Sequence, residues 1–136
     1  MKTNEVLQWI KTLNFKAQHY YVGANDSKKE KSIGIYALDP GPHFVPIGGL
    51  GNKIDHEKKI SILVHWSQYF NESENAAYEL FDELEKLEDV QIGNYTVSYI
   101  ELLNDGPVNI NRDDNGIFEH VIEMNIHYSK NNKEGN

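Results

Sequence analysis

The chain has no cysteine among its 136 residues. Disulfide bonds and catalysis through a thiolate are therefore excluded, and a reducing compartment is its natural environment. Cationic side chains are also scarce, because 13 Lys and Arg stand against 21 Asp and Glu, which gives a net charge of −8. Tight binding to a nucleic-acid backbone requires clustered cations, and this composition argues against it.

Long apolar runs are missing as well. No segment approaches the roughly 20 apolar residues of a membrane-spanning helix, and the first 15 residues lack the uninterrupted apolar run of a signal peptide. A hydrophobic content of 39% and a charged content of 25% are typical of a soluble globular protein. We expect a single α+β domain over residues 1–129, followed by a disordered polar tail over residues 130–136.

Two segments have the periodicity of amphipathic helices. Over residues 4–14, the side chains of Val6, Ile10 and Leu13 fall on one stripe. The second helix is the stronger prediction: Ser73 is expected to cap it, and an apolar stripe lies opposite its acids. That stripe consists of Ala77, Leu80, Phe81, Leu84 and Leu87.

The remaining chain predicts strands. Short runs rich in β-branched and aromatic residues, or with period-two alternation, cover residues 18–23, 33–38, 59–67, 95–103, 108–111 and 117–129. Gly93-Asn94 predicts a tight hairpin, and residues 113–116 predict a second one. Apolar and polar residues alternate along 117–129, which is typical of an antiparallel sheet with one wet face. We therefore expect two helices packed on one face of a mainly antiparallel sheet.

Two segments begin like known ligand-binding motifs but lack the residues that complete them. The sequence Asn111-x-Asp113-x-Asn115 imitates a calcium loop, but its twelfth position is Ile122 rather than Glu, and a strand follows where a helix should. The glycine-rich segment 48–53 ends in Lys without a following Ser or Thr, so it is not a phosphate-binding P-loop.

The histidines do not indicate a site either. His120 and His127 lie seven residues apart on one predicted strand, so they point to opposite faces and cannot share a metal ion. His65, next to Trp66, is predicted to be a hydrogen-bonded residue at the surface or an interface rather than a catalyst. The sequence thus predicts no catalytic, cofactor-binding or metal-binding residues.

A Gly/Pro-rich arm over residues 39–55 separates two predicted strands. Connections longer than about 12–15 residues are usually functional or disordered, and exposed apolar side chains on a loop indicate a partner. We predict a protein interface formed by Pro42, His43, Phe44, Val45, Ile47 and Leu50.

The acids are concentrated in residues 72–89, where eight of them stand against Lys86 alone. The simplest interpretation is a solvated helix face. The sharper hypothesis is a surface that repels DNA or meets a basic partner.

Five segments carry a family resemblance when they are taken in order. They are Ser32-Ile33-Gly34-Ile35-Tyr36, the arm motif within 41–49, Ile62-Leu63-Val64-His65-Trp66, the helix start at 72–78, and residues 107–119. Together they resemble the minor capsid proteins of tailed phages and prophages of Gram-positive bacteria, of the tail-terminator and head–tail joining class. The resemblance covers about residues 30–129, and it rests on structural rather than catalytic residues.

The resemblance implies a small α+β fold that assembles into rings, commonly hexamers. Such a ring caps the tail tube, halts its polymerisation and offers a docking surface to the head connector, while DNA passes through the lumen without specific binding. It implies a virion protein, present in the host cytoplasm during assembly, that is not an enzyme and uses no cofactor. A six-membered ring would carry about −48 charges. Lumen-facing acids would keep DNA from adhering, and we expect this role for Glu79, Asp82, Glu83 and Glu85.

Two other classes stay open at this point. An acidic inhibitor, immunity protein or DNA mimic would share the size, the charge and the lack of catalysis, but it would act as a monomer or dimer. A small hydrolase would use His65 or His120 with a nearby carboxylate.

Overall fold

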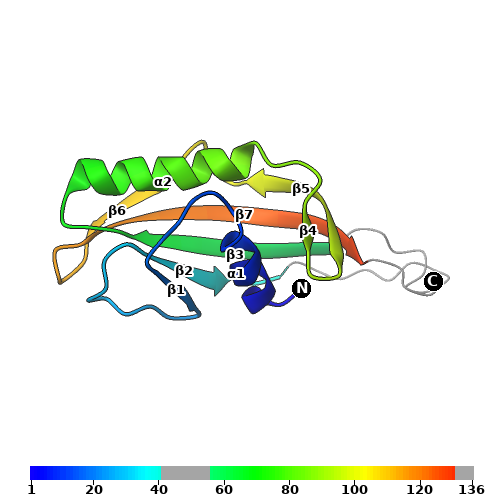
Figure 1. The fold of residues 1–136 in the computed structure, drawn as a ribbon, viewed down its shortest axis with the longest axis horizontal. Helices are drawn as coiled ribbons and strands as arrows, with labels where there is room; N and C mark the ends of the chain where they lie inside the picture. The colour runs from blue at the N-terminus through cyan, green and yellow to red at the C-terminus, as the bar shows by residue number, and fades with distance from the viewer. Residues whose placement is uncertain (41–55, 131–136) are drawn as a thin grey trace.

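The computed structural model describes residues 1–40 and 56–130, and it has an α+β fold (Figure 1). In chain order the described elements are α1 (Thr3–Ile10), β1 (His19–Val22), β2 (Ser32–Ala37), β3 (His56–His65), α2 (Phe70–Glu85), β4 (Gln91–Ile92), β5 (Tyr95–Leu102), β6 (Val108–Arg112) and β7 (Phe118–Lys130). The predicted α+β class is confirmed. Nearly all of the predicted arm and tail lies outside the described residues.

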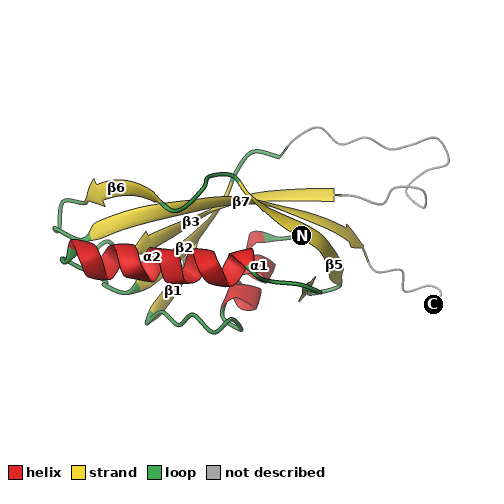
Figure 2. Ribbon diagram, turned by 90° about the horizontal axis from the view of Figure 1, so that it is seen from above, coloured by secondary structure: helices red, strands yellow, loops and turns green. Residues whose placement is uncertain are grey.

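The seven strands form one curled sheet in the order β1-β2-β3-β7-β5-β4, with β6 also paired to β7 (Figure 2). The β1–β2 pair is parallel and the other pairs are antiparallel. The long strand β7 organises the sheet. One edge of β7, from Glu119 to Tyr128, pairs with β3. Its other edge pairs with β6 and β5.

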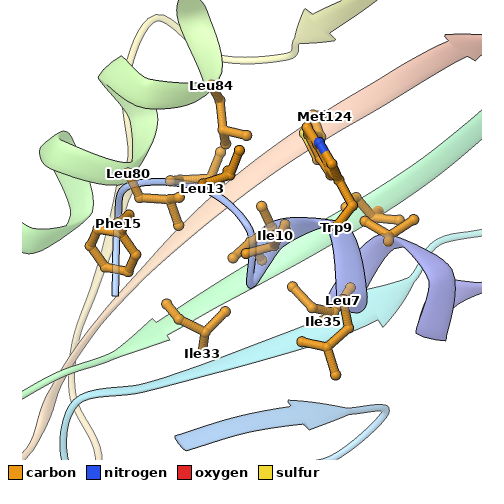
Figure 3. Close-up of a cluster of buried hydrophobic side chains, with 14 of the residues drawn as sticks. Leu7, Trp9, Ile10, Leu13, Phe15, Ile33, Ile35, Leu80, Leu84 and Met124 are labelled. Carbon is orange, nitrogen blue, oxygen red and sulfur yellow. The ribbon is translucent and has the colours of Figure 1, made fainter. Parts of the chain in front are cut away.

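The core follows from the period-two pattern of the two long strands. Alternate residues of β3 and β7 are buried, and they pair across the ladder as Ile60 with Met124 and Ile62 with Ile122. Both helices contribute to the same hydrophobic cluster: Leu80 of α2 is one of its members, as are Leu7 and Ile10 of α1, which lie near β2 (Figure 3). Each fully buried side chain of this type stabilises the fold by about 1.5–3 kcal/mol.

The first helix is shorter than predicted. It ends at Ile10 rather than at residue 14, because tighter bonds from the amides of Thr12 and Leu13 to the carbonyls of Trp9 and Ile10 close its last turn. Leu13 is nevertheless buried, as its place on the apolar stripe predicts. None of the described helices is long and apolar enough to cross a membrane.

The second helix begins earlier than predicted. It starts at Phe70, so Ser73 lies within its first turn and is not the cap. The cap position belongs to Tyr69, whose side chain makes no capping hydrogen bond. Ser73 is fully buried and bonds to Ser67 instead, which places its hydroxyl at the junction of strand and helix.

Both predicted hairpins are confirmed. Ile92 pairs with Tyr95 around Gly93-Asn94, and Arg112 pairs with Phe118 around the second turn. The strand predicted at 59–67 is displaced, since β3 runs from His56 to His65.

Candidate functional site

The predicted partner-binding residues of the arm, from Pro42 to Leu50, lie outside the described residues. The predicted lumen-facing acids lie within the described residues. Glu79, Asp82 and Glu85 are exposed on α2, while the Glu83 side chain is only 16% exposed and forms an ion pair of 3.0 Å with Lys86. Asp82 and Glu83 lie three and four residues after Glu79, and Glu85 lies three residues after Asp82, which places the four on one side of the helix, opposite the buried stripe. The four acids therefore form a coherent surface, which we call the α2 acidic face.

A second surface was not predicted from the sequence. Leu103, Val108 and Ile110 are 42%, 43% and 47% exposed, and they lie on and beside β6. The alternation of Val108 and Ile110 with asparagines resembles a half-buried strand, and nothing in it indicates that the apolar side faces solvent. Exposed apolar side chains near one sheet edge are typical of a contact surface.

Three ionisable side chains converge at one end of the sheet. His65 ends β3, and the ladder pairs it with Glu119 near the start of β7. Nδ1 of His65 lies 2.8 Å from Oε2 of Glu119 and 3.7 Å from Oδ2 of Asp113, which belongs to the β6–β7 turn. Nε2 of His65 lies 3.1 Å from the backbone carbonyl of Ser27. We call His65, Asp113 and Glu119 the His65 cluster.

His65 is fully buried, so the prediction of a surface position is wrong, whereas the predicted hydrogen bonding is confirmed. The reason lies in the parallel β1–β2 pair. After β1 the chain must return to the start of β2, where Ser32 pairs with His65. The returning segment places the Ser27 carbonyl on the ring of His65, and it covers a side chain that would otherwise lie on the wet face.

The bonding of His65 restricts what its ring can carry. The Ser27 carbonyl and an ionised Glu119 carboxylate both accept hydrogen bonds and donate none. The ring satisfies both only if Nε2 carries a proton and Nδ1 carries either a second proton or another cation. Oδ2 of Asp113 is buried and has no hydrogen-bond partner, so the His65 cluster has more acceptors than donors.

His120 is the other buried histidine. It is 1% exposed, and neither ring nitrogen has a hydrogen-bond partner. Burial lowers the pKa of His120 from its ordinary value, and the negative charge of Glu74 opposes this effect more weakly. His127 lies on the opposite face of β7, as predicted, where it stacks on Tyr99 with 4.1 Å between ring centroids.

These positions bear on the hydrolase alternative. A general base must reach a substrate, but the rings of His65 and His120 are both shut off from solvent. A hollow of about 410 Å³ near the N-terminal end of β1 is an open polar surface lined by residues such as Gln18, Lys28 and Gln68. It lacks the apolar enclosure of a small-molecule site.

The model of a family described as bacteriophage tail terminator protein matches residues 1–130. The chain belongs to the bacteriophage tail terminator family. The predicted resemblance to the tail-terminator class is therefore confirmed, and the protein is a structural phage tail protein and a virion component. No curated protein matches the chain.

Proposed function

We propose that this protein terminates phage tails by assembling into a ring, commonly a hexamer, that caps the tail tube, halts its polymerisation and docks the head connector. It performs no catalysis in this role. The family match over residues 1–130 carries the proposal. The class of minor capsid proteins of Gram-positive phages stays part of the proposal, and so does a single domain over residues 1–129.

Ring contacts are heterologous, because one surface of each subunit meets a different surface of the next. Within the described pairings, β1 and β6 each pair with one strand only. Their other edges offer backbone donors and acceptors to a neighbouring chain. We propose that the arm residues Phe44 and Ile47, with the neighbours predicted above, pack against an adjacent ring or tube subunit.

We propose that α1 and α2 pack on one face of the sheet. Their buried side chains belong to one hydrophobic cluster, which supports this arrangement. The polar face of the sheet, with Tyr99 and the surface around Val108, is then available to virion partners.

The α2 acidic face is proposed to line the lumen. Glu79, Asp82 and Glu85 are exposed, and a negative wall repels the phosphate backbone, so DNA passes without binding. The same face also fits an acidic DNA mimic that occupies a basic site, and this is the second candidate function.

The deciding experiment is tube growth. The major tail tube protein of the same phage is polymerised with and without this chain, and tube lengths are measured by electron microscopy. A terminator gives shorter tubes that carry a cap at one end. Unchanged lengths, together with a chain that stays monomeric in the presence of tubes and inhibits a DNA-binding enzyme, would favour the mimic.

The arm is tested in the same assay. Replacing Phe44 and Ile47 with Ser should abolish capping while the isolated chain stays folded. The matched control replaces two exposed aromatic residues away from these surfaces, Tyr69 and Tyr78, with Ser and should cap normally. Equal loss of capping in both variants would contradict a specific role for the arm.

A further inference from the structure

We propose that His65, Asp113 and Glu119 bind one divalent transition-metal ion per chain, with Zn²⁺ as the reference ion. The sequence analysis predicts no metal site, and tail termination does not require one, so this proposal is independent of the proposed function. The three ligand atoms are Nδ1 of His65, Oδ2 of Asp113 and Oε2 of Glu119. They are the only group of three such residues that converges in the described part of the chain.

The spacing of these atoms suits a tetrahedral ion. Zinc binds histidine nitrogen and carboxylate oxygen at about 2.0–2.2 Å, and tetrahedral angles then separate neighbouring ligand atoms by about 3.3–3.6 Å. Nδ1 of His65 lies 2.8 Å from the Glu119 oxygen and 3.7 Å from the Asp113 oxygen. The second separation is close to the required value and the first is about 0.5–0.8 Å too short. The three atoms all lie within 4.8 Å of one another, so rotations of the two carboxylate side chains admit the ion.

The surrounding hydrogen bonds orient each ligand toward the site. Nε2 of His65 donates to the Ser27 carbonyl at 3.1 Å, which leaves the lone pair of Nδ1 for the metal. A histidine ligand typically donates its other ring N–H in this way. In Asp113, Oδ1 accepts from the amides of Asn115 and Ile117 at 2.9 and 3.0 Å. The turn therefore uses one oxygen of Asp113 and leaves the other free.

A proton does not satisfy this site as well as a metal ion does. A proton on Nδ1 pairs His65 with Glu119 but leaves Oδ2 of Asp113 at 3.7 Å, which is beyond hydrogen-bond range. That oxygen is buried without a hydrogen-bond partner, and a buried acceptor that is left unsatisfied is costly. A dication bonds all three atoms at once and neutralises both carboxylates.

An ion has a path to the site. Although His65 is fully buried, the side chains of Asp113 and Glu119 are 16% and 18% exposed. Water completes the fourth position, as it does in zinc sites with three protein ligands. One imidazole with two carboxylates favours borderline ions such as Zn²⁺ over Mg²⁺ and Ca²⁺, which prefer oxygen ligands alone.

A bound ion would cross-link several segments at one end of the sheet. The metal would join the end of β3, the start of β7 and the β6–β7 turn. The segment between β1 and β2 joins the same unit, because Asn115 donates to the carbonyl and the hydroxyl of Ser27 at 3.0 and 3.2 Å. The ion is therefore expected to stabilise the fold rather than to act on a substrate.

The test is a calorimetric titration of the untagged full-length chain with ZnCl₂ after chelator treatment and dialysis. We expect saturation at one equivalent and a rise in the thermal midpoint. Asp113→Asn and Glu119→Gln should each weaken binding at least tenfold. The matched control is His127→Gln, which removes a second histidine–carboxylate pair, His127 with Glu101 at 3.0 Å, and should bind like the unmodified chain.

A measurement on the unmodified chain covers the case in which a variant does not fold. Binding should shift the ¹⁵N resonance of Nδ1 of His65 and leave that ring's Nε2 protonated. Absence of saturable binding at one equivalent overturns the proposal. Normal binding by folded Asp113→Asn and Glu119→Gln also overturns it, and so does an unshifted His65 resonance in a zinc-saturated sample.

Discussion

The hydroxyl of Ser73 accepts a hydrogen bond from the backbone amide of Ser67 at 3.1 Å and donates one to the Ser67 carbonyl at 3.2 Å. Both residues are almost completely buried. The pair joins the chain just after β3 to the first turn of α2. The Ser73 hydroxyl therefore satisfies the Ser67 amide just beyond the end of β3.

Replacing Ser73 with Ala should destabilise the protein by about 1–3 kcal/mol, the usual cost of leaving a buried donor unpaired. The Ser67 carbonyl keeps its hydrogen bond from the Phe118 amide at 2.8 Å. The destabilisation therefore comes from the Ser67 amide, which loses its hydrogen-bond acceptor. Chemical denaturation measures the change. Asn75→Ala, at an exposed position of the same helix, should change stability by less than about 0.5 kcal/mol, and equal losses would contradict this account.

His120 should make the protein sensitive to acid. Its pKa is lowered by burial, so the folded state binds the proton less readily than the unfolded state, whose histidine titrates near pH 6.5. Unfolding then takes up a proton as pH falls below about 6.5, and stability decreases until the lowered pKa of the folded state is passed. Denaturant midpoints measured between pH 8 and pH 4 give the curve.

The variant His120→Leu should lose the part of this slope that His120 causes, and it should be more stable at pH 5. It removes two buried nitrogens that have no hydrogen-bond partners. His19→Gln, at a partly exposed position, keeps His120 and should retain the slope. An unchanged pH dependence in His120→Leu would show that other groups cause the acid sensitivity.

Two glycines with similar backbone angles allow a controlled comparison. Gly93 and Gly116 have φ values of 58° and 79°, which side chains tolerate poorly. A methyl group at Gly93 would lie 2.8 Å from Oε2 of Glu5, whereas nothing lies within 4 Å of one at Gly116. Glu5 accepts the amide of Lys2 at the start of α1, so a displaced Glu5 weakens that bond.

We therefore expect Gly116→Ala to cost about 1–2 kcal/mol through backbone strain alone. Gly93→Ala should cost about 0.5–1 kcal/mol more, because the helix start is disturbed as well. Thermal and chemical denaturation of both variants gives the difference. Equal costs would mean that Glu5 moves aside freely.

The α2 acidic face is tested by replacing Glu79, Asp82, Glu83 and Glu85 together with Lys, which brings the net charge of the chain from −8 to zero. If these acids line the lumen, rings should still assemble, but a phage that carries the variant should lose infectivity because DNA adheres in the channel. A charge-matched control replaces exposed acids outside α2, namely Asp26, Glu30, Asp105 and Asp114. Normal infectivity of the α2 variant would reject the lumen assignment.

The helices and strands with a regular apolar pattern could be predicted, because the side chains that each of them buries recur at a fixed spacing along the local sequence. The alternation along β7 and the apolar stripe of α2 predict elements of the correct type at those places. The boundaries were harder, since α2 begins three residues before Ser73. There a bond to Ser67, across the strand–helix junction, outweighs the capping preference of serine.

The His65 cluster could not be predicted in the same way. His65 and Glu119 are 54 residues apart, and their contact depends on the register between β3 and β7, which no hairpin turn fixes because other elements separate the two strands. The prediction that Asp113 lies in a turn is correct, but whether its Oδ2 faces His65 also depends on the register between β3 and β7. The burial of His65 depends on the parallel β1–β2 pair, which composition does not indicate.

The central position of β7 has a mechanical consequence. A pull along this strand loads the hydrogen bonds to β3 on one side and to β5 and β6 on the other at the same time, instead of opening them one by one. If the chain caps a tail tube as proposed, such shear loading would resist rupture without any covalent cross-link.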